Sequence, residues 1–175
     1  STLWYEGRMT SQMARISGAW PIVLVGMPAD RGRLEVGRQL GATHTFVAGE
    51  DDVAEKVLAL TDGLGVATIA DAAGRAKAVE LSLATIMRTG QIVKIAWGPQ
   101  PLDLSLDPLL HKAVDLHGTF SHTHRTWKAV LALMSAGALD MGSMISEVLP
   151  ITEWERAYEL VDSRQGVKVV LTPVD

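Results

Sequence analysis

The chain has 175 residues, 47% of them apolar and 21% charged, so it can bury a core, and we expect a single domain over residues 1–175. Its 16 basic residues are scattered among 20 acidic ones, which leaves no basic stripe for nucleic acid. The lack of cysteine excludes disulfides, thiolate catalysis and cysteine-based zinc sites. No apolar run approaches the ~20 residues that span a bilayer and no leader opens the chain, so we expect a soluble, cytoplasmic protein without a membrane partner.

Strands and helices alternate along the sequence. Residues 21–26 (PIVLVG) form a short β-branched run between turn formers, which predicts a buried strand. The next helix is expected to begin at Asp30, a typical N-cap, and to stop before Gly41. The same reasoning predicts strands at 43–47, 66–70, 90–96, 113–120 and 167–171, and helices at 51–60, 75–87, 126–136 and 153–162.

This alternation predicts an α/β fold. Strands separated by helices of this length imply right-handed crossovers and a parallel sheet with helices on both faces. The expected fold is therefore a doubly wound parallel sheet.

Six segments resemble the cofactor-binding domain of medium-chain zinc-type alcohol dehydrogenases, in the order and spacing of that family. The sorbitol and threonine dehydrogenase branches are the most similar. The segments are residues 12–19 (QMARISGA), 33–45 (RLEVGRQLGATHT), 60–65 (LTDGLG), 70–74 (ADAAG), 118–122 (GTFSH) and 167–173 (VKVVLTP).

The resemblance implies a Rossmann-like domain that binds NAD or NADP in an intact alcohol or polyol dehydrogenase. In that family a preceding catalytic domain carries the cysteine and histidine ligands of the active zinc, and nothing in this sequence corresponds to it. Zinc is therefore expected only in that domain, and we expect no catalytic or metal-binding residue in this chain. Hydride transfer needs a group that stabilises the developing oxyanion, so the chain is expected to be inactive alone.

The phosphate loop of such a domain should read Gly-x-Gly-x-x-Gly, with the third glycine packing helix against strand. Counting back from Gln12, these positions fall on Thr2, Trp4 and Gly7, so only the packing glycine is kept. The first strand is expected to be truncated or missing, and the domain to be incomplete at its N-terminus. We therefore expect weak dinucleotide binding or none.

The residues after the strand at 21–26 bear on the choice of cofactor. NAD-preferring domains place an acidic side chain at the position that resembles Gly26. A glycine there, with Asp30, Arg31 and Arg33 nearby, leaves room for a 2′-phosphate and favours NADP. The alternative is that the arginines are solvated charges and Asp30 is only a helix cap.

Further cofactor contacts follow from the resemblance. Small residues follow one strand, and aromatic residues follow the next two. Each of these residues also has a purely structural interpretation, as part of a turn, as packing or as the flank of an edge strand. The implied contacts are Ala72, Ala73 and Gly74, Ala96 and Trp97, Phe120 through its backbone, and Lys168 near the pyrophosphate.

Other motifs give weaker hypotheses. Gly63 and Gly65 imitate part of a phosphate loop but precede a strand instead of opening a helix. His122 and His124, with His117 nearby, lack a carboxylate or thiolate of matching spacing for a metal. Ser121 and His122 could suggest a nucleophile and its base, but the elbow motif of a hydrolase does not surround them. A methyltransferase fold is not supported either, because the acidic residue that would bind the ribose is not evident in this sequence.

Two hypotheses remain. The first is the NAD(P)-binding part of a zinc-type dehydrogenase, whose partner is the nicotinamide dinucleotide. The second is a shortened, non-catalytic module of the same fold that serves self-association or assembly. In either case the exposed strand edges predict a homodimer or larger assembly.

Overall fold

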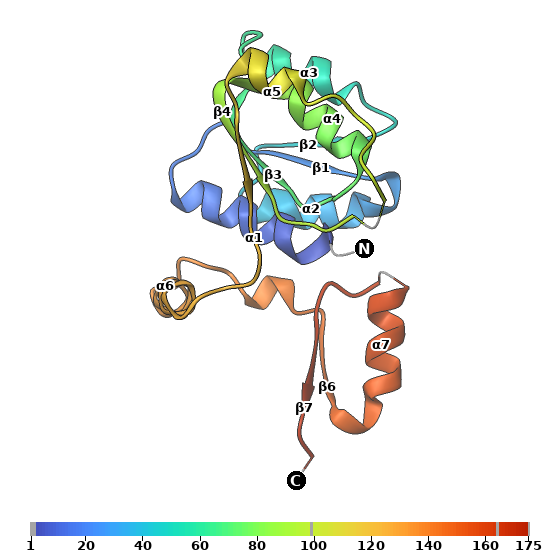
Figure 1. The fold of residues 1–175 in the computed structure, drawn as a ribbon. Helices are drawn as coiled ribbons and strands as arrows, with labels where there is room; N and C mark the ends of the chain where they lie inside the picture. Colours follow the sequence, from blue (N-terminus) through green and yellow to red (C-terminus); the bar gives the residue numbers. More distant parts are fainter. Residues whose placement is uncertain (1–2, 99, 164, 175) are drawn as a thin grey trace. The chain divides into compact units, whose positions relative to one another are not determined.

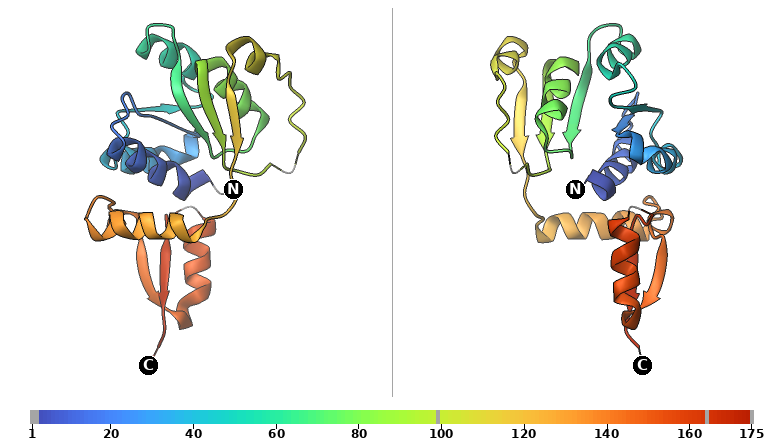
Figure 2. Two further views of the ribbon diagram at one scale, coloured as in Figure 1. Left: turned by 60° about the vertical axis from the view of Figure 1, so that its left-hand side comes forward. Right: turned by 90° about the vertical axis from the view of Figure 1, so that its right-hand side faces the viewer.

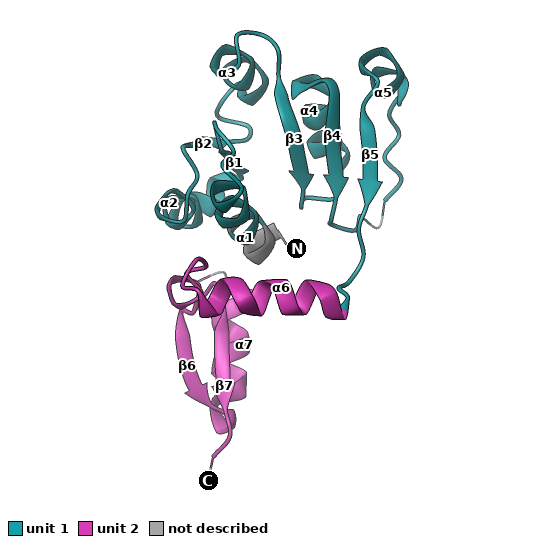
Figure 3. Cartoon of the chain, turned by 90° about the vertical axis from the view of Figure 1, so that its left-hand side faces the viewer, with its two compact units in different colours: residues 1–123 teal, residues 124–175 magenta. Residues whose placement is uncertain are grey.

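The computed structural model describes residues 3–98, 100–163 and 165–174, and the chain divides into two compact units (Figure 3). Unit 1 covers residues 1–123, and unit 2 covers residues 124–175. Unit 1 carries most of the α/β alternation, and unit 2 is a smaller α/β segment. That both units belong to one domain stays a prediction.

Unit 1 contains two parallel sheets (Figure 1). Strand β1 (Val23–Gly26) pairs in parallel with β2 (His44–Val47). The second sheet has the order β3-β4-β5, and Figure 2 shows its strands side by side. Its strands are β3 (Val66–Asp71), β4 (Ile86–Lys94) and β5 (Asp115–Gly118), all parallel.

The sequence explains where the helices of unit 1 begin and end. The backbone N–H of Glu55 donates to the Asp52 side chain, which caps one helix, and Ala113 ends another with a left-handed backbone, at φ 50°. Pro28–Asp30 forms a 3₁₀ turn that leads into the second helix. The helices are α1 (Leu3–Ile16), α2 (Arg31–Gln39), α3 (Val53–Leu60), α4 (Ala76–Thr85) and α5 (Asp107–Lys112).

The buried cluster of unit 1 lies between α4 and the β3-β4-β5 sheet. Val79 and Leu83 of α4 pack with Ile86 and Ile92 of β4, and Ile86 is only 1% exposed. Partly buried apolar side chains from β3, α5 and the loops around them complete the cluster. They are Ile69, Leu102, Leu104, Leu109 and Val114.

The helix predicted at 75–87 is shorter in the structure, and the strand predicted at 90–96 is longer. Helix α4 ends at Thr85, and β4 begins at Ile86 with an extended backbone, at φ −70° and ψ 138°. The side chain of Ile86 fills the buried cluster, so tertiary packing decides the conformation of residues that a local pattern assigned to the helix.

The α/β fold class with parallel strands is confirmed. The sequence predicted one doubly wound sheet with its first strand truncated or missing. In the described residues no ladder joins β1 to β3, and helix α1, instead of a strand, precedes β1. In a doubly wound sheet the first strand lies between the strands that correspond to β1 and β3. The gap between the two observed sheets therefore falls at the position of that first strand.

Unit 2 pairs two parallel strands and packs one helix on them. Strand β6 (Glu147–Pro150) pairs with β7 (Val169–Thr172), and α7 (Trp154–Asp162) connects them. Helix α6 (His124–Ser135) precedes them. The buried side chains of this unit are Leu139, Met144, Leu149 and Ala157.

Candidate functional site

The carboxyl ends of β3, β4 and β5 lie at one edge of their sheet (Figure 3). Lys94 is the last residue of β4, and it pairs in register with Asp71 on one neighbouring strand and with Gly118 on the other. Ligands of parallel α/β sheets bind at this edge, because loops that follow the strands can open around a ligand there. The edge is therefore the candidate site.

Asp71 organises the turn that follows β3. Asp71 is 4% exposed, and its Oδ1 accepts hydrogen bonds from the backbone N–H groups of Ala73 at 2.9 Å and Gly74 at 3.2 Å. Its Oδ2 has no hydrogen-bond partner, and the Nζ of Lys94 lies 3.6 Å from it. A buried carboxylate needs a nearby positive charge, so Lys94 balances the charge of Asp71.

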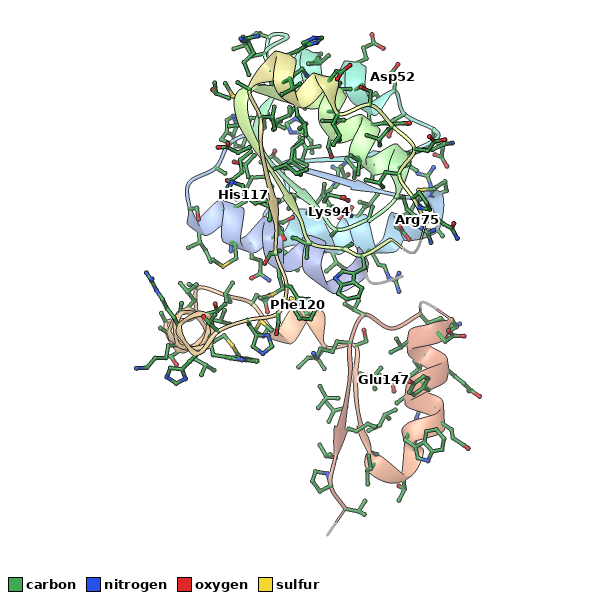
Figure 4. All side chains as sticks on the ribbon, in the orientation of Figure 1. Asp52, Arg75, Lys94, His117, Phe120 and Glu147 are labelled. Atoms are coloured by element: carbon green, nitrogen blue, oxygen red, sulfur yellow. The ribbon has the colours of Figure 1, made fainter. Side chains whose placement is uncertain are left out.

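Lys94 presents its ammonium group at this edge (Figure 4). Its Nζ donates a hydrogen bond of 2.8 Å to the carbonyl oxygen of Ala96. The side chain is 29% exposed, so the charge is neither fully solvated nor buried. An ammonium carries three donors, and in the described residues this bond and the contact with Asp71 are the interactions of its Nζ.

The loops after β3 and β4 approach each other closely. Gly74 has a left-handed backbone, at φ 62°, and a Cβ atom there would lie 2.4 Å from the carbonyl oxygen of Trp97. Only glycine fits at such a contact. The Gly74 position named by the resemblance therefore has a clear packing role.

A cavity of about 330 Å³ opens beside Lys94. Trp97 stands at its rim, and the ring centroid of Phe120 lies 5.7 Å from that of Trp97. Both aromatic side chains are 79% exposed. The lining residues are Lys94, Ile95, Ala96, Trp97, Gly98, Gly118 and Thr119.

A larger cavity of about 520 Å³ lies between α4, α5 and the loop before α5. It includes Lys112, whose Nζ donates to three backbone carbonyl oxygens at the end of α4 and the start of β4. It is away from the carboxyl ends of the strands, and its one cation is used structurally. The smaller cavity is therefore the better candidate for a ligand.

The expected ribose position lies at the end of β1. Gly26 is its last residue, and a Cβ atom there would lie 3.1 Å from the Cβ of Asp30. The side chain of Asp30 is buried, and its Oδ2 accepts from the backbone N–H of Met27 at 2.9 Å. Asp30 is thus the N-cap residue of α2, as predicted, but its carboxylate holds the preceding turn and makes no cap bond.

The arginines expected near a 2′-phosphate differ in their surroundings. The guanidinium of Arg31 is exposed and forms an ion pair with Glu50. Arg33 is partly buried. A phosphate at this position would therefore compete with Glu50 for Arg31.

The remaining predicted contacts belong to different elements of the two units. Gly7 lies in α1, where a Cβ atom would be 3.3 Å from the Cδ1 of Leu24, so its role is helix–strand packing. Thr2 and the side chain of Trp4 lie outside the described residues. Lys168 is an exposed residue of unit 2, whereas Ala73, Ala96, Trp97 and Phe120 all lie near the candidate site in unit 1.

Sequence reasoning did not assign roles to Asp71 and Lys94. A signal was present, because each is a charged residue that directly follows apolar residues at the end of its strand, in the segments TIAD and IVK. Their pairing depends on the register of two strands and is not visible in either segment alone.

The described residues carry neither a metal-binding cluster nor a membrane-spanning helix. No group of three or more histidine, aspartate or glutamate side chains in this part of the chain is arranged to hold a metal ion. None of its helices combines the length and apolar character needed to cross a membrane.

The folding pattern is that of a Rossmann-type α/β domain, with a candidate site at the ends of its parallel strands. Residues 7–136 match the family model described as "Zinc-binding dehydrogenase", so the chain belongs to this family. The predicted resemblance to zinc-type dehydrogenases is confirmed.

The curated relatives that this chain resembles include several dehydrogenases. D-arabitol-phosphate dehydrogenase of Enterococcus avium is 29% identical over 91% of this chain and 46% of its own length. Sorbitol dehydrogenase of Halalkalibacterium halodurans is 25% identical over 97% and 49%, and L-threonine 3-dehydrogenase of Bacillus subtilis is 29% identical over 95% and 48%. The chain thus spans about half the length of these relatives.

Solved structures confirm the fold. Alcohol dehydrogenase TADH from Thermus sp. ATN1 has a TM-score of 0.86 at 28% identity, over 98% of this chain and 49% of that one. A short chain alcohol dehydrogenase from Escherichia coli CFT073, solved in complex with NADH, has a TM-score of 0.86 at 16% identity, over 97% and 50%.

Proposed function

We propose that this chain is the cofactor-binding part of an NAD(P)-dependent alcohol or polyol dehydrogenase. The observation that carries the proposal is the cavity at the carboxyl ends of β4 and β5, which is lined by Lys94 and Trp97; the ring of Phe120 lies 5.7 Å from that of Trp97. Its position is the one at which parallel α/β sheets bind ligands. Family membership and a structural neighbour complexed with NADH support the same conclusion.

The residues present fit one end of the dinucleotide better than the other. A flat nicotinamide ring suits an open cavity of about 330 Å³ that is lined by the aromatic side chain of Trp97. The pyrophosphate end has less support in the described residues, because Gly7 lies within α1 and packs against Leu24. We therefore infer that this chain binds the cofactor mainly through its nicotinamide end.

When bound, the nicotinamide ring supplies the carbon that accepts or donates a hydride. The residues of this chain would orient that ring. Trp97 and Phe120 would cover one side of it and exclude water, while the close contact of Gly74 with Trp97 would hold the loops in place. A group that stabilises the substrate oxygen would come from elsewhere, so we propose that the chain alone turns over no alcohol.

The alternative of an assembly module without a cofactor has less support. The three relatives described above are all named as dehydrogenases, and each is matched along more than nine-tenths of this chain. Self-association remains compatible with the dehydrogenase proposal, because each chain of an oligomer can carry its own site.

Titration with NADH and NADPH tests the proposal. Amide chemical shifts of the ¹⁵N-labelled chain should change for residues 72–74, 96–98 and 118–120. The dissociation constants should be about 1 mM or weaker, which corresponds to about 4 kcal/mol. Comparing the two cofactors also tests the predicted preference for NADP, which stays a prediction.

Two outcomes would contradict different parts of the proposal. Micromolar affinity would contradict the inference that the chain binds the cofactor mainly through the nicotinamide end, because it would require firm contacts to the pyrophosphate as well. No shift change at about 10 mM of either cofactor would show that the strand-end cavity is not a dinucleotide site.

A further inference from the structure

We propose that unit 2 is a dimerisation element, in which helix α6 of one chain packs antiparallel on helix α7 of a second copy, and the reverse contact forms at the same time. The two helices lie within residues 124–162, so the contact is separate from the candidate cofactor site in unit 1. It is also separate from the unpaired strand edges of β1 and β3, which belong to unit 1.

Helix α6 exposes an apolar stripe. None of its 12 residues, all of them described, is buried, although a helix of this length draws most of its stability from packing an apolar face. Trp127, Leu131 and Met134 follow one another at intervals of four and three, so they share one face. They are 39% to 52% exposed. This face, which we call the α6 stripe, therefore gains stability if a partner covers it.

Helix α7 carries a stripe with the same spacing. The α7 stripe is Trp154, Tyr158 and Val161, which are 48% to 75% exposed. The helix packs on β6 and β7 through a neighbouring face, where Ala157 is buried. Helix α6 runs across the direction of α7 (Figure 3), and both stripes stay exposed, so the two helices of one chain do not cover each other.

The two stripes are flanked by opposite charges. On α6, Lys128 directly follows Trp127, and Arg125 lies one turn before Lys128. On α7, an acidic residue directly follows each residue of the stripe, so the charges of both helices lie on the same side of their stripes. These side chains are exposed and form no ion pair with another described residue; the acidic ones are Glu155, Glu159 and Asp162.

The charges also stand at unfavourable ends of their helices. A helix dipole favours acidic side chains in the first turn and basic ones in the last. Helix α6 has Arg125 and no acidic residue in its first turn, and α7 ends with Glu159 and Asp162 and has no basic residue in its last turn. This placement destabilises each helix by itself, so a contact that joins the two helix ends explains it better than local stability does.

Antiparallel packing joins those two ends. Helices that meet face to face bring equivalent flanks to the same side of the contact only if they run in opposite directions. The start of α6 then lies beside the end of α7, with Arg125 and Lys128 next to Glu159 and Asp162. A two-fold axis repeats the contact and covers all four stripes, so the assembly closes as a dimer.

Mixing two charge-reversed variants tests the proposal. The α6 variant carries Arg125→Glu and Lys128→Glu, and the α7 variant carries Glu159→Lys and Asp162→Lys. Each variant alone places like charges at both contacts, so its dimer dissociation constant from analytical ultracentrifugation should rise by about 100-fold. An equal mixture should recover the dimer of the unmodified chain, because both contacts of a mixed dimer again join opposite charges.

Controls separate this contact from changes in folding and net charge. Both reversals agree better with the helix dipoles, so circular dichroism should show folded chains. Arg75→Glu with Lys77→Glu makes the same charge change at exposed residues near the start of α4 and should leave the dissociation constant unchanged. Leu131→Ser should weaken the dimer about tenfold, whereas Leu64→Ser, at another exposed leucine, should not.

Three outcomes would overturn the proposal. The first is a monomer in the unmodified chain at every concentration. The second is undiminished association of either charge-reversed variant. The third is failure of the folded variants to recover the dimer when they are mixed, because the charges of α6 and α7 would then not face each other. Thr68→Lys weakens the strand edge of β3, so recovery in the mixture should persist when both variants also carry it. Loss of recovery there would assign the contact to the strand edges instead.

Discussion

Lys112, the last residue of α5, donates a hydrogen bond of 2.9 Å to the carbonyl oxygen of Ile86, the first residue of β4. The same Nζ reaches the carbonyl oxygens of Leu83 at 2.7 Å and Ala84 at 3.1 Å. One ammonium therefore satisfies backbone groups at the end of α4, where the helix dipole also favours a positive charge. This contact explains how a helix can end directly at the start of a buried strand.

Replacement of Lys112 by Met should lower the free energy of unfolding by about 1–2 kcal/mol, because carbonyl groups at the helix end lose a charged donor. Urea denaturation followed by circular dichroism measures the change. Lys77→Met on the exposed face of α4 is the control and should stay within about 0.5 kcal/mol of the unmodified chain. Equal stability of the two variants would show that Lys112 has no capping role.

Replacement of Gly98 by Ala should destabilise the chain by about 1–3 kcal/mol, since the new methyl group would overlap with backbone. Its Cβ would lie 2.1 Å from the carbonyl oxygen of Gly74. Gly118→Ala is the matched comparison, because a Cβ there meets nothing within 4 Å and the change should be nearly neutral. Thermal and urea unfolding of both variants test the prediction, which an unaltered Gly98→Ala protein would contradict.

Asp51 should contribute to the acid limb of the stability profile. Its carboxylate accepts hydrogen bonds from the Nζ of Lys56 at 2.5 Å and the backbone N–H of Val47 at 2.6 Å, and these lower its pKa below the ordinary value of 3.8. A lowered folded-state pKa gives a contribution that is complete above the unfolded-state value and is lost as the pH falls through the folded-state pKa.

The Asp51→Asn variant should therefore show a smaller loss of unfolding free energy than the unmodified chain when the pH falls below about 4. Urea denaturation at a series of pH values measures both profiles. Lys56→Met removes the largest cause of the shift and should flatten the profile in the same sense. Parallel profiles for all three proteins would refute the assignment.

Self-association is expected because strand edges are left without a partner. In the described residues, β1 has β2 as its one neighbouring strand and β3 has β4, so each of these two strands leaves one edge unpaired. Analytical ultracentrifugation should show a dimer or larger species at high concentration. Thr68→Lys places a charge at an exposed position of β3 and should shift the equilibrium toward monomer. A monomer in the unmodified chain at every concentration would end this proposal.

The candidate site was only partly predictable from sequence. Ala96, Trp97 and Phe120 lie at or just after the ends of predicted strands, so a resemblance in local order was enough to bring them to the same edge. Lys94 and Asp71 were missed, because their importance comes from a contact of 3.6 Å across two strands that are separated by a helix. The ion pair of Arg31 with Glu50 joins segments 19 residues apart and was equally invisible.

The sequence by itself determined the order and type of most elements, since apolar periodicity and caps such as Asp52 act within a few neighbouring residues. Tertiary structure alone decided that residues 86–89 belong to strand β4 and not to the preceding helix. It also decided that the parallel strands of unit 1 form two separate sheets, β1-β2 and β3-β4-β5. It also decided which charged side chains meet. These features depend on burial and strand register, which are set by contacts between distant segments and have no local signal in the chain.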